Sequence, residues 1–288
     1  MKKKFRIVKK RVNRSAAGSA FIFIIVLIFA LFTALPLVYA ISNSLKPLNE
    51  LFRFPPLLFP IHPTLKNFSD LGEVLDTSWV PMTRYLFNTV FITVAGTAGQ
   101  IIFASMAAYP LAKMKFPGKN FIFQMIFVSL MFNTSVTAIP SFIIMSNLNW
   151  IDTYWALIIP AFGSSFGMYL MKNFMEQIND AIIEAAKIDG ASELRVFFQI
   201  VMPQVKSAWL TMIIFSVQAL WNMGSTTYIY REELKTLVYA LGQISASGIA
   251  RAGVASAIAV VMLVVPVTVF IITQSNIIET MSSAGVKE

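Results

Sequence analysis

Few side chains in this sequence could carry out covalent or acid–base chemistry. The 288 residues include no cysteine and a single histidine, His62, which lies between two prolines as an ordinary loop residue would. The absence of cysteine excludes disulfides, thiolate metal sites and cysteine nucleophiles. The long apolar stretches of the chain also lack Lys, Arg, Asp and Glu, so they offer no acid, base or metal ligand. These features argue against an enzyme.

One long polar segment, residues 176–203, has a pattern that suits docking to another protein rather than catalysis. It predicts two short helices separated by a sharp turn, because each helix has its own capping residue and a glycine lies between them. The helix dipole favours an acidic residue in a first turn, and a proline is tolerated there. The residues in these roles are Asn179 or Asp180 as the first cap, 181–188 as the first helix, Gly190 as its end, Ser192 as the second cap, Glu193 in the turn that follows it, and Pro203 in the first turn of the next apolar stretch.

The first of these helices would present small side chains around a carboxylate. Ala181, Ala185 and Ala186 flank Glu184, which leaves a low-profile surface that a partner protein could approach closely. The same pattern also fits an amphipathic helix that rests on lipid headgroups. Composition alone leaves both interpretations open.

The elements that must position this segment are membrane-spanning helices. Hydrophobic residues make up 57% of the chain and charged residues 13%, with a mean hydropathy of +0.69, so there is too little polar surface to coat a soluble globule. A bilayer core requires about 20 apolar residues per helix, with every backbone polar group paired inside it. The sequence therefore predicts an all-α integral membrane protein with six transmembrane helices. The charge-free windows that meet the requirement are 15–45, 85–112, 120–151, 153–171, 207–230 and 252–278.

Four prolines lie well inside these windows, away from their ends, where each removes a backbone donor and invites a kink. They are Pro36, Pro140, Pro160 and Pro266. Glycines and hydroxyl residues are also frequent within the windows, and we interpret them as places where helix backbones approach one another closely.

The distribution of Lys and Arg sets the expected orientation, because cytoplasmic flanks accumulate them. Eight basic residues crowd the N-terminal segment 1–14, which we therefore place in the cytoplasm. The six-span domain, 15–278, then returns the tail 279–288 to the same side. This order makes residues 46–84 an extracytoplasmic loop and residues 176–203 a cytoplasmic one. The net charge of +9 does not indicate nucleic-acid binding, since a basic run beside a span is typical of a topogenic segment facing anionic lipid.

Several polar side chains fall at membrane depth within the windows and need hydrogen-bond partners. They would face either the interior of the bundle, as packing residues, or an aqueous cavity that carries a solute. The same residues are equally consistent with helix packing. The candidates for the substrate pathway are Asn88, Gln100, Asn133, Gln218, Trp221 and Asn222.

The polar segment resembles the EAA signature of ABC importer permeases. That signature is Glu-Ala-Ala, followed after three residues by Gly and after nine more by Ile-x-Leu-Pro. The chain has Glu184-Ala185-Ala186, then Gly190, then Ile200-Val201-Met202-Pro203, so that only Met202 departs from the pattern. The resemblance implies a coupling helix that sits in a cleft of an ATPase subunit. The residues expected to make that contact are Glu184, Ala185, Ala186, Asp189, Gly190, Ala191 and Pro203.

The resemblance covers most of the chain and is greatest for the maltose-transporter-type branch, which carries carbohydrates. It includes the segments 107–119, 151–161, 236–241 and 284–288 and the Trp221-Asn222 pair, with departures at Pro110 and Val238. It implies the ABC importer permease fold in a bacterial or archaeal cytoplasmic membrane. The implied partners are a second homologous permease subunit in a heterodimer, two ATPase subunits that bind ATP and Mg²⁺, an extracytoplasmic solute-binding protein and membrane lipid. This chain would hold no cofactor itself.

The C-terminal tail is a second expected contact. In the maltose system the equivalent tail reaches into the ATPase dimer. The resemblance therefore makes Ser282, Ser283 and Gly285 candidates for the same contact here.

A facilitative uniporter or a secondary transporter of a neutral solute is the alternative. Proton relays normally place a carboxylate or histidine at membrane depth, and none of the six windows contains one. A neutral-lined uniporter passes that test but leaves the 184–203 pattern unexplained. The chain also lacks a GxxxxGK[ST] phosphate loop, so ATP hydrolysis would occur in a partner subunit. We expect an oligosaccharide cargo first, with glycerol phosphate or another polyol derivative still open.

Overall fold

The computed structural model describes residues 16–76, 80–132, 134–224, 227–246, 248 and 251–284, with side chains for 17–73, 80–132, 135–224, 227–246, 248 and 251–274. Within these residues all regular secondary structure is helical, as the composition predicts. The longer helices are α1 (Ala16–Ser44), α3 (Lys66–Asp76), α4 (Met82–Lys113), α5 (Lys119–Ser129), α6 (Thr134–Asn147), α7 (Trp155–Phe162), α8 (Ser165–Glu176), α9 (Asp180–Ile188), α12 (Lys206–Trp221), α13 (Leu237–Ser245) and α14 (Ala252–Ala284). The shorter ones are α2 (Leu48–Leu51), α10 (Glu193–Val196), the π-helix η1 (Phe197–Val201), α11 (Met202–Gln204) and the 3-10 helix η2 (Glu232–Leu234).

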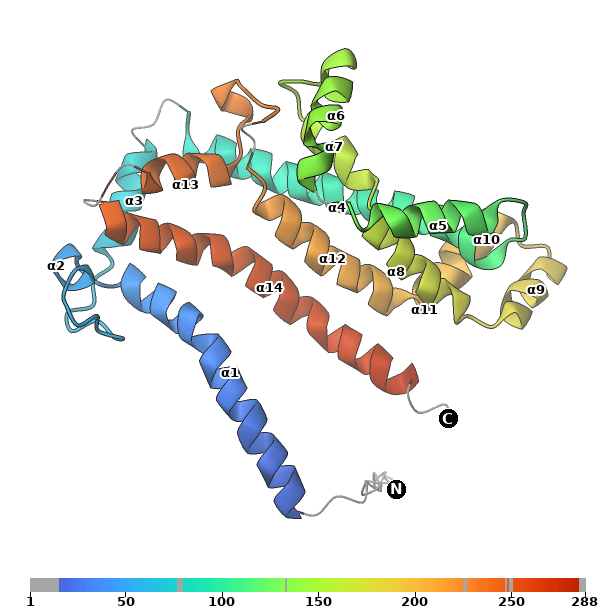
Figure 1. Ribbon diagram of the computed structural model, residues 1–288, viewed down its shortest axis with the longest axis horizontal. Helices are drawn as coiled ribbons and strands as arrows, with labels where there is room; N and C mark the ends of the chain where they lie inside the picture. Colours follow the sequence, from blue (N-terminus) through green and yellow to red (C-terminus); the bar gives the residue numbers. More distant parts are fainter. Residues whose placement is uncertain are drawn as a thin grey trace, which may run out of the picture.

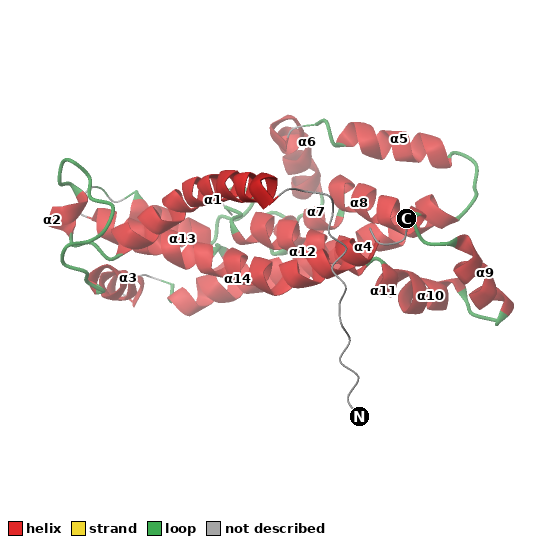
Figure 2. Ribbon diagram, turned by 90° about the horizontal axis from the view of Figure 1, so that it is seen from below, coloured by secondary structure: helices red, strands yellow, loops and turns green. Residues whose placement is uncertain are grey.

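Helix α12 lies between α4 and α14 and packs against both (Figure 1). Helix α4 also contacts α7 and α8, while α14 contacts α1 and α3. One end of the bundle carries α2, α3 and α13 and is called the α13 end below. The opposite end carries α9 and α10 and is called the α9 end (Figures 1 and 2). The long helices connect these two ends.

Three helices in the described part of the chain are long and apolar enough to cross a bilayer. They are α1 from Ala17, α4, and α14 as far as Gln274, and they correspond to three of the predicted windows. A fourth is obtained if the stretch from α10 to α11 counts with α12 as one span, although the two parts meet at a bend of 78°. Pro36 and Pro266 lie inside α1 and α14 without ending either helix.

The windows 120–151 and 153–171 each form two helices rather than one kinked helix. The first divides into α5 and α6, which point in clearly different directions (Figure 1). The second divides near Gly163, whose N–H bonds to the Pro160 carbonyl at 3.3 Å, and Ser164 then caps α8 through its hydroxyl. Hydropathy located the apolar residues but not these breaks, because a charge-free stretch does not specify the path of its backbone.

Helix α4 lies centrally because small residues line the faces where other helices cross it. A Cβ atom at Gly96 would collide with a leucine of α12, and one at Gly99 would meet the ring of Phe162 on α7. The hydroxyls of Thr97 and Ser216 share a hydrogen bond of 3.0 Å between α4 and α12. The prediction that small residues allow close helix approach is confirmed at these positions.

Side chains hold the loop after α1 together at the α13 end. Lys46 is 2% exposed, and its amine bonds to Asn43 Oδ1 at 2.7 Å. The buried carboxylate of Glu50 accepts hydrogen bonds from the N–H of Ile61 at 2.9 Å and of His62 at 3.0 Å. It also lies 2.8 Å from His62 Nδ1, so the one histidine has a partner within its own loop.

We predict that Gly99→Ala lowers the thermal stability of the purified protein relative to Gly72→Ala. Both glycines lie inside helices, so both changes gain about 1 kcal/mol of helix propensity. Only the methyl group at 99 collides with Phe162, whereas a Cβ at 72 meets nothing within 4 Å. Overpacking of this kind costs about 1–3 kcal/mol. Unfolding midpoints in the same detergent test the prediction, and a midpoint for Gly99→Ala at or above that of Gly72→Ala would contradict it.

Candidate functional site

The polar segment between α8 and α12 begins as the sequence predicts. Asn179 caps α9 by accepting a hydrogen bond from the Ala181 N–H at 3.0 Å, and Gly190 follows the helix with a φ of 81°. Ser192 caps α10 by accepting from the Arg195 N–H at 3.4 Å. The capping rules suffice here because each involves residues only a few positions apart.

The prediction is wrong at Pro203, which does not lie in the first turn of the next membrane helix. It lies in α11, and α12 begins only at Lys206, after the chain bends by 78°. Helices α10, η1 and α11 together form one stretch from Glu193 to Gln204. Proline has no N–H to donate to the residue four positions earlier, so a regular α-helix is interrupted there, and the wider turns of η1 directly precede α11.

The outer surface of α9 and α10 is open and carries large apolar side chains among charged ones. Ile188 of α9 is 86% exposed and Leu194 of α10 is 63% exposed, although both are large hydrophobic residues. Glu184 is exposed too, and it takes part in none of the ion pairs among the described residues. We call the surface formed by Ile182, Glu184, Ala185, Ile188 and Leu194 the α9 face. Exposed apolar groups of this kind suit contact either with another protein or with lipid headgroups.

Two of the expected contact residues face inward instead. Ala186 and Ala191 are half-buried and pack against a core cluster that includes Ile183, which is 5% exposed. Asp189 and Gly190 are exposed at the turn between the two helices. Of the small residues in the segment, Ala185 therefore lies on the outer surface, whereas Ala186 and Ala191 pack against the core.

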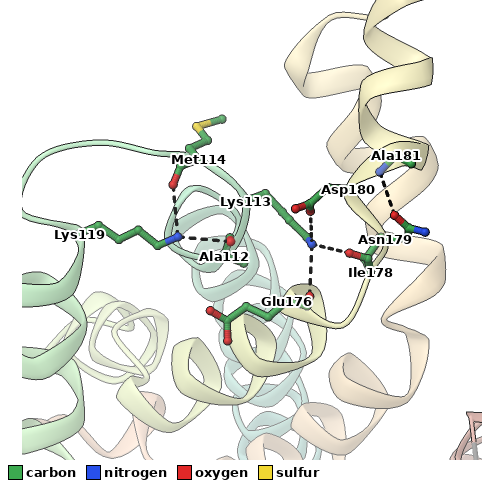
Figure 3. A network of polar contacts seen from close by, with 9 residues as sticks. All are labelled: Ala112, Lys113, Met114, Lys119, Glu176, Ile178, Asn179, Asp180 and Ala181. Atoms are coloured by element: carbon green, nitrogen blue, oxygen red, sulfur yellow. Dashed lines mark hydrogen bonds and ion pairs between the residues drawn. The ribbon is translucent and has the colours of Figure 1, made fainter.

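Lys113, the last residue of α4, holds the start of α9. Its side chain is 6% exposed, and its amine donates to the carbonyls of Glu176 at 3.3 Å and Ile178 at 2.5 Å and to Asp180 Oδ1 at 2.6 Å (Figure 3). These acceptors belong to the end of α8, the linker and the first turn of α9. All three donors of the ammonium group are thus used. The hydrogen bond and charge of Lys113 hold the pKa of the Asp180 carboxyl below its ordinary value.

Tyr109, one turn earlier in α4, holds the start of α10. Its hydroxyl donates to Glu193 Oε2 at 2.9 Å, and its ring packs on Phe197 with the centroids 5.5 Å apart. Glu193 also pairs with Lys187 of α9 at 2.5 Å, which joins the two short helices. The Lys187 ammonium, together with the Tyr109 hydroxyl, lowers the pKa of Glu193 although partial burial opposes the shift.

The sequence did not single out Lys113 or Tyr109. Both residues fall within the segment 107–119, which counted only toward the family resemblance. Their partners Asp180 and Glu193 lie 67 and 84 positions away, beyond the reach of any local rule. The one sequence feature that links Tyr109 and Lys113 is their spacing of four positions, because residues four apart lie on the same face of a helix.

Two of the predicted substrate-pathway residues form hydrogen bonds with other parts of this chain. Asn88 is fully buried, and its amide donates to the carbonyls of Glu233 and Lys235 at 2.8 Å and accepts from the Tyr154 hydroxyl at 2.7 Å. Trp221 is 3% exposed, and its indole N–H donates to a backbone carbonyl of α14 at 3.1 Å. Both residues therefore fit the packing alternative rather than an exposed sugar site.

Gln218 of α12 and Asn222, which directly follows this helix, line a cavity of 420 Å³. The other lining residues come from α12 and α14 and are apolar. Asn222 Nδ2 donates to the Gln218 carbonyl at 2.8 Å.

Of the remaining predicted residues, Gln100 is half-buried in α4. Outside the described residues or side chains lie Asn133, Ser282, Ser283 and Gly285.

Residues 100–281 match the family model described as "binding-protein-dependent transport system inner membrane component". The matched range covers the C-terminal part of α4, everything from α5 to α13 and most of α14, including the α9 face and the cavity. The chain belongs to this permease family. The resemblance inferred from the pattern at Glu184, Gly190 and Pro203 is thereby confirmed. The permease is a transport component rather than a catalyst.

Curated relatives agree with this assignment. The permease is 35% identical over 190 residues to Protein LplC of Bacillus subtilis, and the alignment covers 66% of this chain and 62% of LplC, less than two thirds of that relative. It is 30% identical over 204 residues to the polygalacturonan/rhamnogalacturonan transport system permease protein YtcP of the same species, covering 71% and 69%. It is 29% identical over 203 residues to the sn-glycerol-3-phosphate transport system permease protein UgpE of Yersinia enterocolitica, covering 70% and 72%.

Solved structures show the same fold. One chain of a bacterial ABC transporter involved in the import of the acidic polysaccharide alginate matches with a TM-score of 0.76 at 23% identity, covering 91% of the permease and 98% of that chain. A second match, from an alginate ABC transporter in complex with an alginate pentasaccharide-bound periplasmic protein, has a TM-score of 0.60 at 13% identity and covers 88% and 91%. The permease therefore has the ABC importer permease fold.

We predict that Asn88→Ala destabilises the permease, while Asn222→Ala changes its unfolding midpoint little. Removal of the buried Asn88 amide takes away the donor of two part-buried hydrogen bonds to the Glu233 and Lys235 carbonyls, and each lost bond costs about 0.5–1.5 kcal/mol. Asn222 is exposed, so water can replace its side chain. Unfolding midpoints and proteolysis of the loop before α13 measure the difference. Equal midpoints for the two variants would contradict the structural role of Asn88.

Proposed function

We propose that the permease forms half of the translocation pathway of an ATP-driven oligosaccharide importer and that its α9 face docks on an ATPase subunit. The observation that carries this proposal is the exposure of Ile188 and Leu194 on two short helices held at the end of the membrane helices. Burial of one such side chain stabilises a contact by roughly 1.5–3 kcal/mol, so this surface favours a partner. The ATPase subunits bind ATP and Mg²⁺, and this chain holds no cofactor.

The proposed topology has six spans and both ends of the chain in the cytoplasm. Helices α1, α4, α12 and α14 each make one crossing, and the broken pairs α5–α6 and α7–α8 make the other two. The N-terminal end of α1 and the C-terminal end of α14 both point toward the half of the molecule that carries α9 (Figure 1). The eight basic residues in the segment 1–14 support the cytoplasm as that side, within a bacterial or archaeal cytoplasmic membrane.

The other proposed partners complete the importer. A second homologous permease subunit would close the pathway against α12 and α14, whose cavity is lined by apolar residues together with Gln218 and Asn222. A solute-binding protein would deliver the cargo from outside. The structural neighbour that was solved with a pentasaccharide-bound periplasmic protein supports this arrangement.

The proposed cargo is an oligosaccharide. Two of the similar proteins are described by the polysaccharides polygalacturonan/rhamnogalacturonan and alginate, and UgpE by sn-glycerol 3-phosphate, which makes a polyol phosphate the second candidate. A cavity wall that is apolar except for a small number of amides suits a sugar. A sugar needs some hydrogen bonds and also apolar contact with its ring faces.

A facilitative uniporter or secondary transporter is the alternative function. A secondary transporter needs a titratable group at membrane depth, and the six windows contain no Asp, Glu, His, Lys or Arg. A uniporter needs no ATPase and gives the α9 face no role.

We predict that Gly190→Asp removes the ATPase from the purified complex, whereas Gly118→Asp does not. The two glycines are a matched pair, because they have φ values of 81° and 84° and open space around a Cβ atom. Both changes therefore introduce similar strain, about 1–2 kcal/mol. Only Gly190 lies beside the α9 face, so ATPase recovered with a tagged permease should fall about tenfold in that variant alone, a loss of ~1.4 kcal/mol.

Glu184→Lys should reduce the recovered ATPase in the same way, because it reverses the charge of an exposed residue of the α9 face. Membrane fractionation provides the control for insertion of all three variants. Equal recovery in Gly190→Asp and Gly118→Asp would count against docking at the α9 face. A purified permease that carries solute with no ATPase present would favour the uniporter.

We predict that the solute-binding protein of this importer binds oligosaccharides and not sn-glycerol 3-phosphate. Calorimetric titration with galacturonate oligomers, neutral oligosaccharides and sn-glycerol 3-phosphate distinguishes the candidates. Dissociation constants near 1 μM correspond to about −8.2 kcal/mol and are readily measured. Binding of the glycerol phosphate alone would overturn the proposed cargo while leaving the ATPase contact unaffected.

A further inference from the structure

We propose that Lys113 and Tyr109 are positioning residues that couple the ATPase-bound α9 and α10 to α4, so that α4 carries their movement to the α13 end. This inference rests on the proposed docking of an ATPase at the α9 face. It assigns the two side chains a role in regulating that contact rather than in forming it.

Both short helices are attached to α4 by polar bonds at their first turns. Lys113 bonds to Asp180 at the start of α9, and Tyr109 bonds to Glu193 at the start of α10. The two α4 residues are four positions apart and therefore lie on one face of its last turn. Pro110 lies between them and has no N–H to donate. The two attachments therefore lie on either side of Pro110.

Lys113 also fixes the chain that enters α9. Its amine bonds to the carbonyls of Glu176 and Ile178, so the end of α8 and the linker are held by the same group that holds α9 (Figure 3). A charge-assisted hydrogen bond is roughly twice as strong as a neutral one. Displacement of α9 therefore pulls on α4 directly, in addition to any effect through α8.

The other end of α4 is fastened to the loop that precedes α13. The Tyr85 hydroxyl donates to Glu232 Oε1 at 2.7 Å, Asn88 donates to two backbone carbonyls of this loop, and Thr89 Oγ1 accepts from the Leu237 N–H at 2.8 Å. The 32 residues of α4 span about 48 Å. A rigid helix bonded at both ends transmits a displacement along its length, which links the α9 face with the α13 end.

The test uses the assembled importer in lipid nanodiscs and measures ATP hydrolysis with and without solute-loaded binding protein. Lys113→Met removes all three donors but keeps a long apolar side chain. The matched control is Lys172→Met, because the Lys172 amine is also little exposed and pairs with Glu176 at 2.8 Å within α8, without joining α8 to α4. Stimulation by the binding protein should fall at least about fivefold in Lys113→Met, the lower end of ordinary coupling factors, with ATPase content and basal hydrolysis retained.

Rescue and a second variant separate positioning from general stability. Lys113→Arg keeps the charge and several donors and should recover part of the stimulation. Tyr109→Phe removes only the hydroxyl bond to Glu193 and keeps the ring contact with Phe197, so it should also lower stimulation with the complex intact.

Three results would overturn the inference. They are unchanged stimulation in both Lys113→Met and Tyr109→Phe, an equal fall in Lys172→Met, and loss of the ATPase from the Lys113 and Tyr109 variants, which would assign these residues to assembly alone. A wild-type permease that never retains an ATPase would instead overturn the proposed function. The two failures are therefore distinguishable in one set of preparations.

Discussion

Close contact along α4 is the constraint on which the rest of the structure depends. Lipid supplies no hydrophobic force between helices, so their association requires tight packing and hydrogen bonds across the interface. Helix α4 meets this requirement with Gly99 against Phe162 and with the bond between Thr97 and Ser216. With its middle enclosed in this way, α4 has its two ends free for attachments, and the structure uses both of them.

The local part of the candidate site was predictable because its rules are short-range. Asn179, Gly190 and Ser192 act on neighbours a few positions away, and their roles follow from residue type alone. Pro203 was misplaced because its position depends on how a π-helix and a bend of 78° follow one another. That geometry is decided by the packing of the segment against the helices beneath it, which no local pattern specifies.

Polar residues at membrane depth show a different limit on what the sequence can predict. The sequence indicates that Asn88 and Trp221 need partners, since an unpaired polar group in the apolar interior is costly. It does not indicate who the partners are, because the Asn88 amide bonds to carbonyls 145 and 147 positions away. Gln218 has the same residue chemistry yet lies on a cavity wall. The difference between a packing amide and a cavity amide is therefore a tertiary property, as are the breaks within the windows 120–151 and 153–171.

The two short helices of the α9 end are held by a buried apolar contact and by polar bonds that can rearrange. Their apolar side, including Ile183 and Val196, is buried in a cluster with residues of α4 and α8, and this contact favours movement as a unit. Their polar attachments join the carboxylates of Asp180 and Glu193 to Lys113 and Tyr109 of α4, and such bonds rearrange at less cost than a packed core does. The six charge-free windows contain no Asp, Glu, His, Lys or Arg that could bias one conformation over another, so we infer that a bias enters from outside the membrane. A ligand shifts a conformational equilibrium only by binding the two states differently, and an exposed apolar surface attached to a central helix is a place where a partner can do so.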